Sequence, residues 1–203
     1  MIVAKKGDKG TKVRVIQRLL NVYPDGIFGY LTEEAVKEWQ KAHNLTVDGI
    51  VGVETWKTLL VRAIQPAHRN ITEIIVHCTA TPAGKDYTVT DIKAWHLLRG
   101  FSDIGYHYVI YRDGSIHDGR KVTIAGAHCT GHNTNSIGVC YVGGLGRDGK
   151  TPKDTRTYQQ RVALEQLLTQ LRALYPKAKI YGHRDFANKA CPSFNAKKEF
   201  ADI

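Results

Sequence analysis

Residues 73–81 of this 203-residue chain read Glu73-Ile-Ile-Val-His-Cys-Thr-Ala-Thr81, an apolar run that ends in a histidine and a cysteine. A short run of β-branched residues bounded by polar ones is typical of a buried β-strand. A second such run, Lys179-Ile-Tyr-Gly-His183, also ends in a histidine. Side chains at strand ends are held by the sheet, while the loops that follow leave room for a substrate. We therefore expect His77 and His183 to belong to one site.

The residues between these two runs show strand patterns and helix patterns in turn. We expect helices over residues 90–99 and 157–174, and strands over residues 106–111, 115–117 and 136–142. The turn Arg112-Asp-Gly-Ser115 joins two of these strands as a hairpin. One hairpin among intermingled strands and helices predicts an α+β domain, in which helices pack on a mixed β-sheet.

Residues 1–60 contain an internal repeat. Asp25-Gly-Ile-Phe-Gly-Tyr-Leu-Thr32 recurs 23 residues later as Asp48-Gly-Ile-Val-Gly-Val-Glu-Thr55. Asp-Gly pairs favour turns, and a threonine after a turn can cap a helix. Apolar residues at helical spacing follow each turn and also precede the first one. We expect a small three-helix domain with two matching turns, in which Thr32 and Thr55 are N-caps.

This repeat resembles the peptidoglycan-binding domain of bacterial and phage wall hydrolases. The resemblance covers roughly residues 8–60 and includes Val36-x-x-Trp-Gln40 between the two turns. It implies attachment to the cell wall without chemistry of its own. We predict a peptidoglycan-binding domain over residues 1–62, a linker over residues 63–70, and the α+β domain over residues 71–203.

Composition and charge limit the setting in which the chain works. The first ten residues lack an apolar segment, which excludes a conventional signal peptide, and no apolar run is long enough to predict a transmembrane segment. The four cysteines are therefore expected to stay reduced. Most of the net charge of +10 lies in residues 61–203, and such a field attracts polyanions, including anionic envelope components. No helix has a dense basic face with base-reading side chains, so we expect no nucleic-acid partner.

Cys191 follows His183 across a polar loop that is long enough to curl back to the same point. Two imidazoles and a thiolate suit zinc, and a catalytic zinc site uses three protein ligands and leaves the fourth position for water. The spacing alone leaves two interpretations open, a zinc site or unrelated side chains, because the gap between His183 and Cys191 matches no general zinc-finger spacing.

Several short motifs in a fixed order carry a second resemblance. They are Ile75-Val-His-Cys-Thr-Ala-Thr81, Gly105-Tyr-His-Tyr108, Ala127-His128, Asn135-Ser-Ile-Gly-Val139, and Gly182-His-Arg followed by Lys189-Ala-Cys-Pro-Ser193. Over roughly residues 70–198 they resemble the type 2 N-acetylmuramoyl-L-alanine amidases, a superfamily shared by phage amidase lysozymes and animal peptidoglycan recognition proteins. The resemblance implies one zinc ion per chain, bound by His77, His183 and Cys191, and catalytic roles for Tyr106 and Lys189.

These roles fit the chemistry of amide hydrolysis. Zinc makes an attacking water available at neutral pH and can polarise the carbonyl. Tyr106 can hydrogen-bond the water or the oxyanion, and the Lys189 ammonium suits the developing negative charge. His128 and Asn133 are further candidates, as substrate contacts that line the cleft.

One position departs from the cytosolic amidases that recycle wall fragments. Those enzymes carry a glutamate in the strand after Ser-Ile-Gly and an aspartate as third zinc ligand. This sequence has Cys140 and Cys191 at the corresponding positions. It is therefore more similar to the phage and recognition-protein branch of the superfamily.

We predict an endolysin-like enzyme that cleaves the amide bond between N-acetylmuramic acid and L-alanine in peptidoglycan. Without a signal peptide it would stay in the host cytoplasm until a membrane pore admits it to the wall, and we expect a monomer. A prophage or bacterial autolysin built from the same parts is an alternative. A non-catalytic recognition protein is another, which the complete set of two histidines and a cysteine disfavours.

Overall fold

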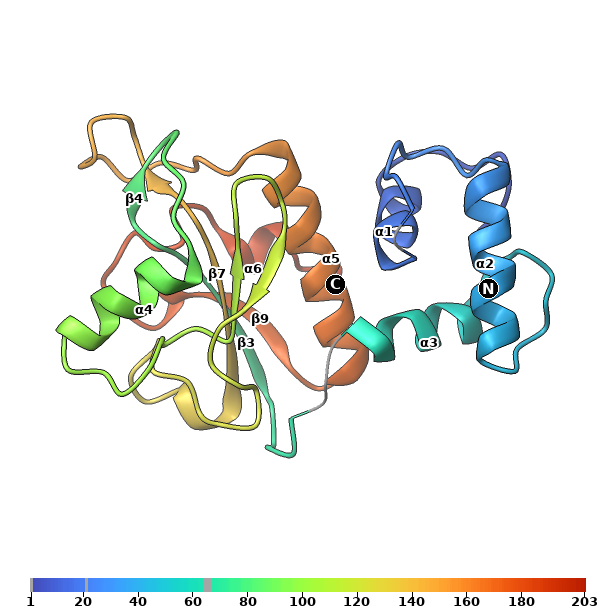
Figure 1. The fold of residues 1–203 in the computed structure, drawn as a ribbon. Coiled ribbons are helices and arrows are strands. Elements are labelled where there is room, and N and C mark those ends of the chain that lie inside the picture. Colours follow the sequence, from blue (N-terminus) through green and yellow to red (C-terminus); the bar gives the residue numbers. More distant parts are fainter. Residues whose placement is uncertain (1, 21, 64–66) are drawn as a thin grey trace. The chain divides into compact units, whose positions relative to one another are not determined.

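The computed structural model describes residues 2–20, 22–63 and 67–203 (Figure 1). The chain divides into two compact units, residues 1–65 and 66–203. The predicted linker is only partly covered, because residues 64–66 lie outside the described residues, while residue 63 still belongs to a helix. Among the helices described, none is long and apolar enough to cross a membrane.

The first unit contains three helices and a small sheet. Its elements are β1 (Ile2–Ala4), α1 (Thr11–Leu19), α2 (Tyr30–Ala42), β2 (Val51–Gly52) and α3 (Val53–Ala63). The two strands pair antiparallel. The three helices confirm the predicted three-helix domain.

The sequence repeat supplies the core of this unit in equivalent pairs. One buried cluster contains the repeat-related pairs Val13 and Val36, Ile16 and Trp39, and Phe28 and Val51. α1 and α2 therefore bury side chains at equivalent positions of the repeat, and each helix is followed by the same type of turn.

Thr32 and Thr55 do not cap their helices, contrary to our prediction. α2 begins at Tyr30 after an extended Gly29, so Thr32 lies within its first turn, and Thr55 lies within the first turn of α3. Both threonines are buried, and each hydroxyl contacts the side chain of a buried glutamine instead of the helix backbone. A pattern of residue types could not show this, because the glutamine comes from the preceding helix.

The second unit is built around a five-stranded sheet. Its elements are β3 (Glu73–Cys78), β4 (Thr81–Pro82), α4 (Val89–Leu98), β5 (Tyr108–Ile110), β6 (Ile116–Asp118), η1 (Asn133–Asn135), β7 (Ser136–Tyr141), β8 (Gly144–Leu145), α5 (Tyr158–Leu174), β9 (Lys179–Gly182), η2 (His183–Asp185) and α6 (Ala196–Glu199). The strand order is β6-β5-β7-β3-β9, with β5, β7, β3 and β9 parallel and β6 antiparallel to β5. The predicted mixed sheet and its hairpin are confirmed.

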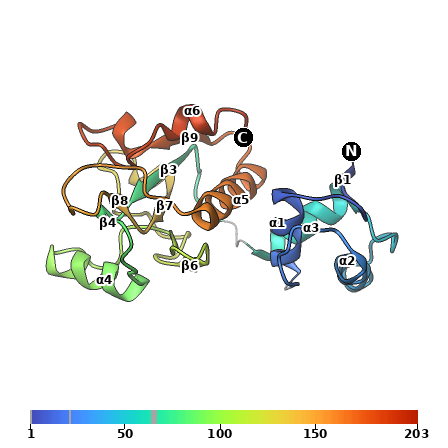
Figure 2. The same cartoon turned by 90° about the horizontal axis from the view of Figure 1, so that it is seen from above.

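α4 and α5 lie on opposite sides of this sheet (Figures 1 and 2). Both begin with a capping box, in which Thr88 and Thr157 accept a hydrogen bond from the backbone three residues on. α4 thus begins at Val89, one residue before the predicted start. On the α4 side, Ile92 packs with Val109 of β5.

Strand register decides on which face the first histidine lies. His77 pairs with Cys140 of β7, and Cys140 pairs in turn with Val109 of β5. Paired residues on neighbouring strands point to the same face of a sheet. His77 therefore faces the α4 side, while α5 covers the other face.

Candidate metal centre and active site

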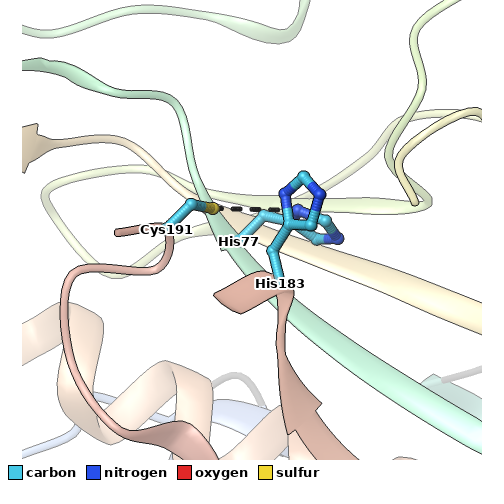
Figure 3. A group of neighbouring side chains, drawn as sticks. All are labelled: His77, His183 and Cys191. Atoms are coloured by element: carbon cyan, nitrogen blue, oxygen red, sulfur yellow. Dashed lines mark hydrogen bonds between the residues drawn. The ribbon is translucent and has the colours of Figure 1, made fainter. Parts of the chain in front are cut away.

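Three side chains from three separate segments meet at the carboxyl end of β3. His77 comes from β3. His183 begins the short 3-10 helix η2 directly after β9, and Cys191 comes from the loop that follows (Figure 3). One ring nitrogen of each histidine and Cys191 Sγ all lie within 4.8 Å of one another. β3 and β9 are parallel neighbours, so both histidines lie at the carboxyl end of the sheet. The structure thus brings together the three residues predicted from the sequence.

The loop that carries Cys191 is tied down on both sides of the cysteine. The Arg184 backbone N–H donates to Cys191 O at 2.7 Å, and the Tyr141 hydroxyl donates to Pro192 O at 2.7 Å. The Cys78 backbone N–H donates to Cys191 Sγ at 3.3 Å. This N–H favours the thiolate, which is the form that binds metals, whereas the Cys78 thiol and burial raise the pKa of Cys191 above its usual value in the chain without a metal.

His77 is the deepest of the three side chains, with 1% of its surface exposed. Its Nδ1 lies 3.8 Å from Cys191 Sγ, and its Nε2 lies 3.0 Å from His128 Nδ1. Burial, followed by the nearby His128 and His183, lowers the pKa of His77 well below its usual value. The ring is therefore neutral at pH 7 and can offer one nitrogen lone pair to a metal.

Tyr106 and Lys189 both line the cleft beside these side chains. The Tyr106 ring centroid is 5.2 Å from that of His77. Burial, followed by the neighbouring thiols, raises the pKa of Tyr106, so its hydroxyl stays protonated and can donate a hydrogen bond. Lys189 is exposed at the rim, and its charge adds to burial in lowering the pKa of His183.

The cleft has a volume of about 410 Å³. Arg99 and Lys189 are cations among its described lining residues, and none of those residues is a carboxylate. Cys140 is fully buried in β7. The described lining thus offers polar, imidazole and cationic groups for chemistry, but no carboxylate general base.

His128 and Asn133 also line the cleft, but their polar atoms are engaged within the chain. Asn133 Oδ1 accepts the backbone N–H groups of His128 and Cys129 at 2.8 and 2.9 Å. The His128 ring is 8% exposed and contacts His77 on one side and Ser136 on the other. Substrate contact by these two residues stays a prediction.

Two neighbours of the site were missed from the sequence, the Cys78 backbone and Ser136. Ser136 Oγ lies 3.4 Å from His128 Nε2, and Ser136 is the first residue of β7, the strand that pairs with β3. Strand pairing would not have found Ser136 either, because Ser136 pairs with Glu73 at the far end of β3 from His77 and reaches the site only through the His128 ring. Hydrophobic patterns identify strands but not their partners.

The second unit matches a known protein family. Residues 67–194 match the family model described as N-acetylmuramoyl-L-alanine amidase. The chain belongs to the N-acetylmuramoyl-L-alanine amidase family. Residues 9–59 match the model described as a putative peptidoglycan binding domain, which agrees with the repeat found in the first unit.

Individual relatives of this amidase are phage proteins. The endolysin of Enterobacteria phage K11 is 45% identical over 126 residues, which covers 62% of this chain and 83% of the endolysin. The endolysin of Escherichia phage T7 is 43% identical over 125 residues, covering 62% of this chain and 82% of the endolysin. Both cover less than two thirds of the present chain, so part of it has no counterpart in those matches.

Solved structures support the fold of the amidase unit. The endolysin amidase LysCS from Clostridium intestinale superposes with a TM-score of 0.56 at 30% identity, covering 65% of this chain and 81% of that one. Drosophila PGRP-LB superposes with a TM-score of 0.53 at 28% identity, covering 68% and 81%. The predicted family and fold class are therefore confirmed.

Proposed function

We propose that this amidase is an endolysin-like zinc enzyme that hydrolyses the bond between the lactyl group of N-acetylmuramic acid and L-alanine in peptidoglycan. Water is consumed, the C–N bond breaks, and a lactyl carboxylate and a free L-alanine amine result. The observation that carries the proposal is the convergence of His77, His183 and Cys191 beside an open cleft. It stands in the unit that matches the amidase family.

The donor set fits zinc. Two imidazoles and one thiolate are a first shell that zinc prefers, with three protein ligands in a catalytic site. Ligand atoms of a tetrahedral zinc site lie about 3.3–3.8 Å apart, given bond lengths of about 2.0–2.3 Å. The 3.8 Å between Cys191 Sγ and His77 Nδ1 agrees with that spacing. When bound, zinc supplies Lewis acidity, which polarises the amide carbonyl and acidifies water.

Two side chains of the cleft are suited to the transition state. The amide oxygen becomes negative as the carbonyl carbon is attacked, and a preorganised donor or cation stabilises that charge. Tyr106 supplies a hydroxyl that stays protonated, and Lys189 supplies an ammonium at the rim. We assign the catalytic roles to these two residues.

The first unit gives the enzyme a way to stay on its insoluble substrate. Its match to a peptidoglycan binding domain supports a role as wall anchor. The related phage endolysins support a wall-lytic role during release from a host cell. In this proposal, residues 1–62 bind the cell wall, residues 63–70 link the two units, and residues 71–203 hydrolyse the amide bond.

The bond that is cut distinguishes the proposal from its alternatives. Purified sacculi incubated with zinc-loaded protein should gain L-alanine amino termini without new reducing sugar ends. A Cys191→Ser variant, which lacks the thiolate, is the matched control and should produce few L-alanine amino termini and few reducing sugar ends. New reducing ends in proportion to lysis would indicate a glycosidase, and binding without any release would indicate a recognition protein.

A further inference from the structure

The two ring nitrogens of His77 face different partners. Nδ1 faces Cys191 Sγ at 3.8 Å, and Nε2 faces His128 Nδ1 at 3.0 Å. A neutral imidazole carries one proton, so only one nitrogen has a free lone pair. If Nδ1 is to bind a metal, the proton must sit on Nε2, where it can be donated to His128 Nδ1.

The same reasoning fixes the proton of His128. Its Nδ1 can accept from His77 only if its own proton is on Nε2. That nitrogen lies 3.4 Å from Ser136 Oγ, a hydroxyl that can accept it. A directed series of hydrogen bonds thus runs from His77 through His128 to Ser136.

The surroundings of His128 are shaped to hold its ring in this place. A Cβ added at Gly126 or at Gly138 would overlap the His128 ring, so these two glycines, from a loop and from β7, leave the space that the ring fills. The Asn133 carboxamide oxygen accepts the backbone N–H groups of His128 and Cys129 and so holds the backbone that carries the ring. A side chain that merely contacted substrate at the cleft surface would need neither the recess nor the inward hydrogen bonds.

We propose that His128 is a positioning residue for the metal centre: it accepts the Nε2–H of His77 and thereby holds Nδ1 deprotonated and aimed at the metal position. The proposal rests on the proposed function only in that the metal is zinc. Partners behind a ligating histidine fix its tautomer and orientation, and their loss typically costs about 10–100-fold in metal affinity. In this role His128 acts through His77.

Two substitutions separate the hydrogen bond from simple filling of space. His128→Phe keeps a planar ring but removes the acceptor, and His128→Asn keeps a polar acceptor close to the position of Nδ1. Zinc affinity, measured by competition with a chromophoric chelator, should fall by about 10–100-fold in His128→Phe and by only a few-fold in His128→Asn. His117→Phe, the same change on β6 outside the described cleft lining, is the matched control and should bind zinc normally.

The second measurement needs neither zinc nor turnover. Ring ¹⁵N chemical shifts of the metal-free wild-type protein should show His77 as the Nε2–H tautomer. That preference should disappear in His128→Phe and return in His128→Asn. Equal losses of zinc affinity in the Phe and Asn variants, wild-type affinity in folded His128→Phe, or a wild-type His77 protonated on Nδ1 would each overturn the proposal. Wild-type protein that binds no zinc would contradict the proposed function, while the tautomer of His77 would still decide the role of His128.

Discussion

Lys189 stands two residues before Cys191, yet we expect substitutions of the two residues to have different effects. Lys189→Ala leaves all three metal donors in place and removes a cation beside the reacting amide. By analogy with the loss of one oxyanion donor, turnover should fall by about a hundredfold or more. Zinc content should stay near one per chain. Muropeptide binding should change little, because the ground-state amide carries no full negative charge. Turnover measured beside metal analysis checks this prediction.

Cys191→Ser and Tyr106→Phe complete that comparison. Serine is hardly ionised at neutral pH, so Cys191→Ser should lose zinc and activity together. Tyr106→Phe should keep zinc and lose turnover, as Lys189→Ala does. Full activity in Lys189→Ala and Tyr106→Phe would show that the catalytic roles are misassigned. Tight zinc binding by Cys191→Ser would point to another donor, and Cys78 and His128, which also line the cleft, would then have to be considered as ligands.

His107 predicts a loss of stability in mild acid. Its ring is buried, Nδ1 accepts the Gly138 backbone N–H at 2.9 Å, and Nε2 donates to Ile124 O at 3.0 Å. Burial is the main reason why the pKa of His107 falls from 6.5 to about 4. Below pH 6.5 the unfolded chain binds a proton that the folded chain resists. The contribution of His107 is therefore fully present above pH 6.5 and is lost as the pH falls towards 4.

A variant without the imidazole isolates this effect. The unfolding free energy of metal-free wild type should exceed that of His107→Phe at pH 7. The gap should shrink by up to about 3 kcal/mol between pH 7 and pH 4, at about 1.36 kcal/mol per pKa unit. Urea titrations at a series of pH values, with a chelator present, measure this gap. A gap that stays constant with pH would mean that His107 is not held neutral by its surroundings.

At the scale of single residues, the sequence could predict the donors but not their supports. His77 and His183 stand at strand ends, and the short motifs that resemble the amidase family added Cys191, so the sequence indicated which three side chains would meet. Ser136 belongs to the site through the position of the His128 ring, and the Cys78 backbone belongs to it through the path of the loop that carries Cys191. Those are tertiary facts, and neither composition nor periodicity contains them.

Among the elements, the repeat of the first unit gives a prediction with a built-in comparison. Gln17 Oε1 accepts the Gly26 backbone N–H and Gln40 Oε1 accepts that of Gly49, both at 2.9 Å. Each amide nitrogen also lies within hydrogen-bonding distance of the aspartate and the threonine of its own turn. Both glutamines are buried, with 1% exposed. Each one fastens a helix to the turn that follows it.

Replacing either glutamine by leucine should therefore have nearly the same effect. Gln17→Leu and Gln40→Leu each leave buried donors and acceptors unpaired, which should cost about 2–4 kcal/mol of the stability of the first unit. Lys41→Ala, an exposed change on α2, is the control and should stay within about 0.5 kcal/mol. Hydrogen exchange of amides in α1 and α2 measures the loss in the full chain. A large cost at one glutamine and none at the other would show that the two turns are not energetically equivalent.

The element boundaries show where local patterns stop being informative. The five predicted segments of the second unit that flank the site all formed, because their apolar residues repeat with the period of a strand or a helix. The helix starts were wrong at Thr32 and Thr55, since a threonine near a turn can cap a helix or bond to a side chain, and the start of α4 was displaced by one residue because Thr88 is its cap. The short pair β4 and β8 was not predicted, because two-residue strands carry no periodicity.

For the whole molecule, the division into two compact units implies that amide hydrolysis and wall binding can be separated. Each unit has its own core, and the family matches at residues 9–59 and 67–194 do not overlap. A fragment of residues 65–203 should fold, bind zinc and hydrolyse soluble muropeptides at close to the rate of the full chain. All described residues of the proposed metal and catalytic site lie within it.

The same fragment should be much weaker on intact walls. A second binding module raises the local concentration of the active site on an insoluble substrate, and such linkage typically adds about 10²–10⁴-fold in apparent affinity. Sedimentation with purified sacculi should show that the full chain and residues 1–62 are retained while residues 65–203 stay in solution. Equal retention of the full chain and residues 65–203 would place the wall-binding surface on the amidase unit, where cations such as Arg99 and Lys189 already surround the cleft. Raising the salt concentration tests whether these cations are responsible, because screening weakens the attraction between exposed charges.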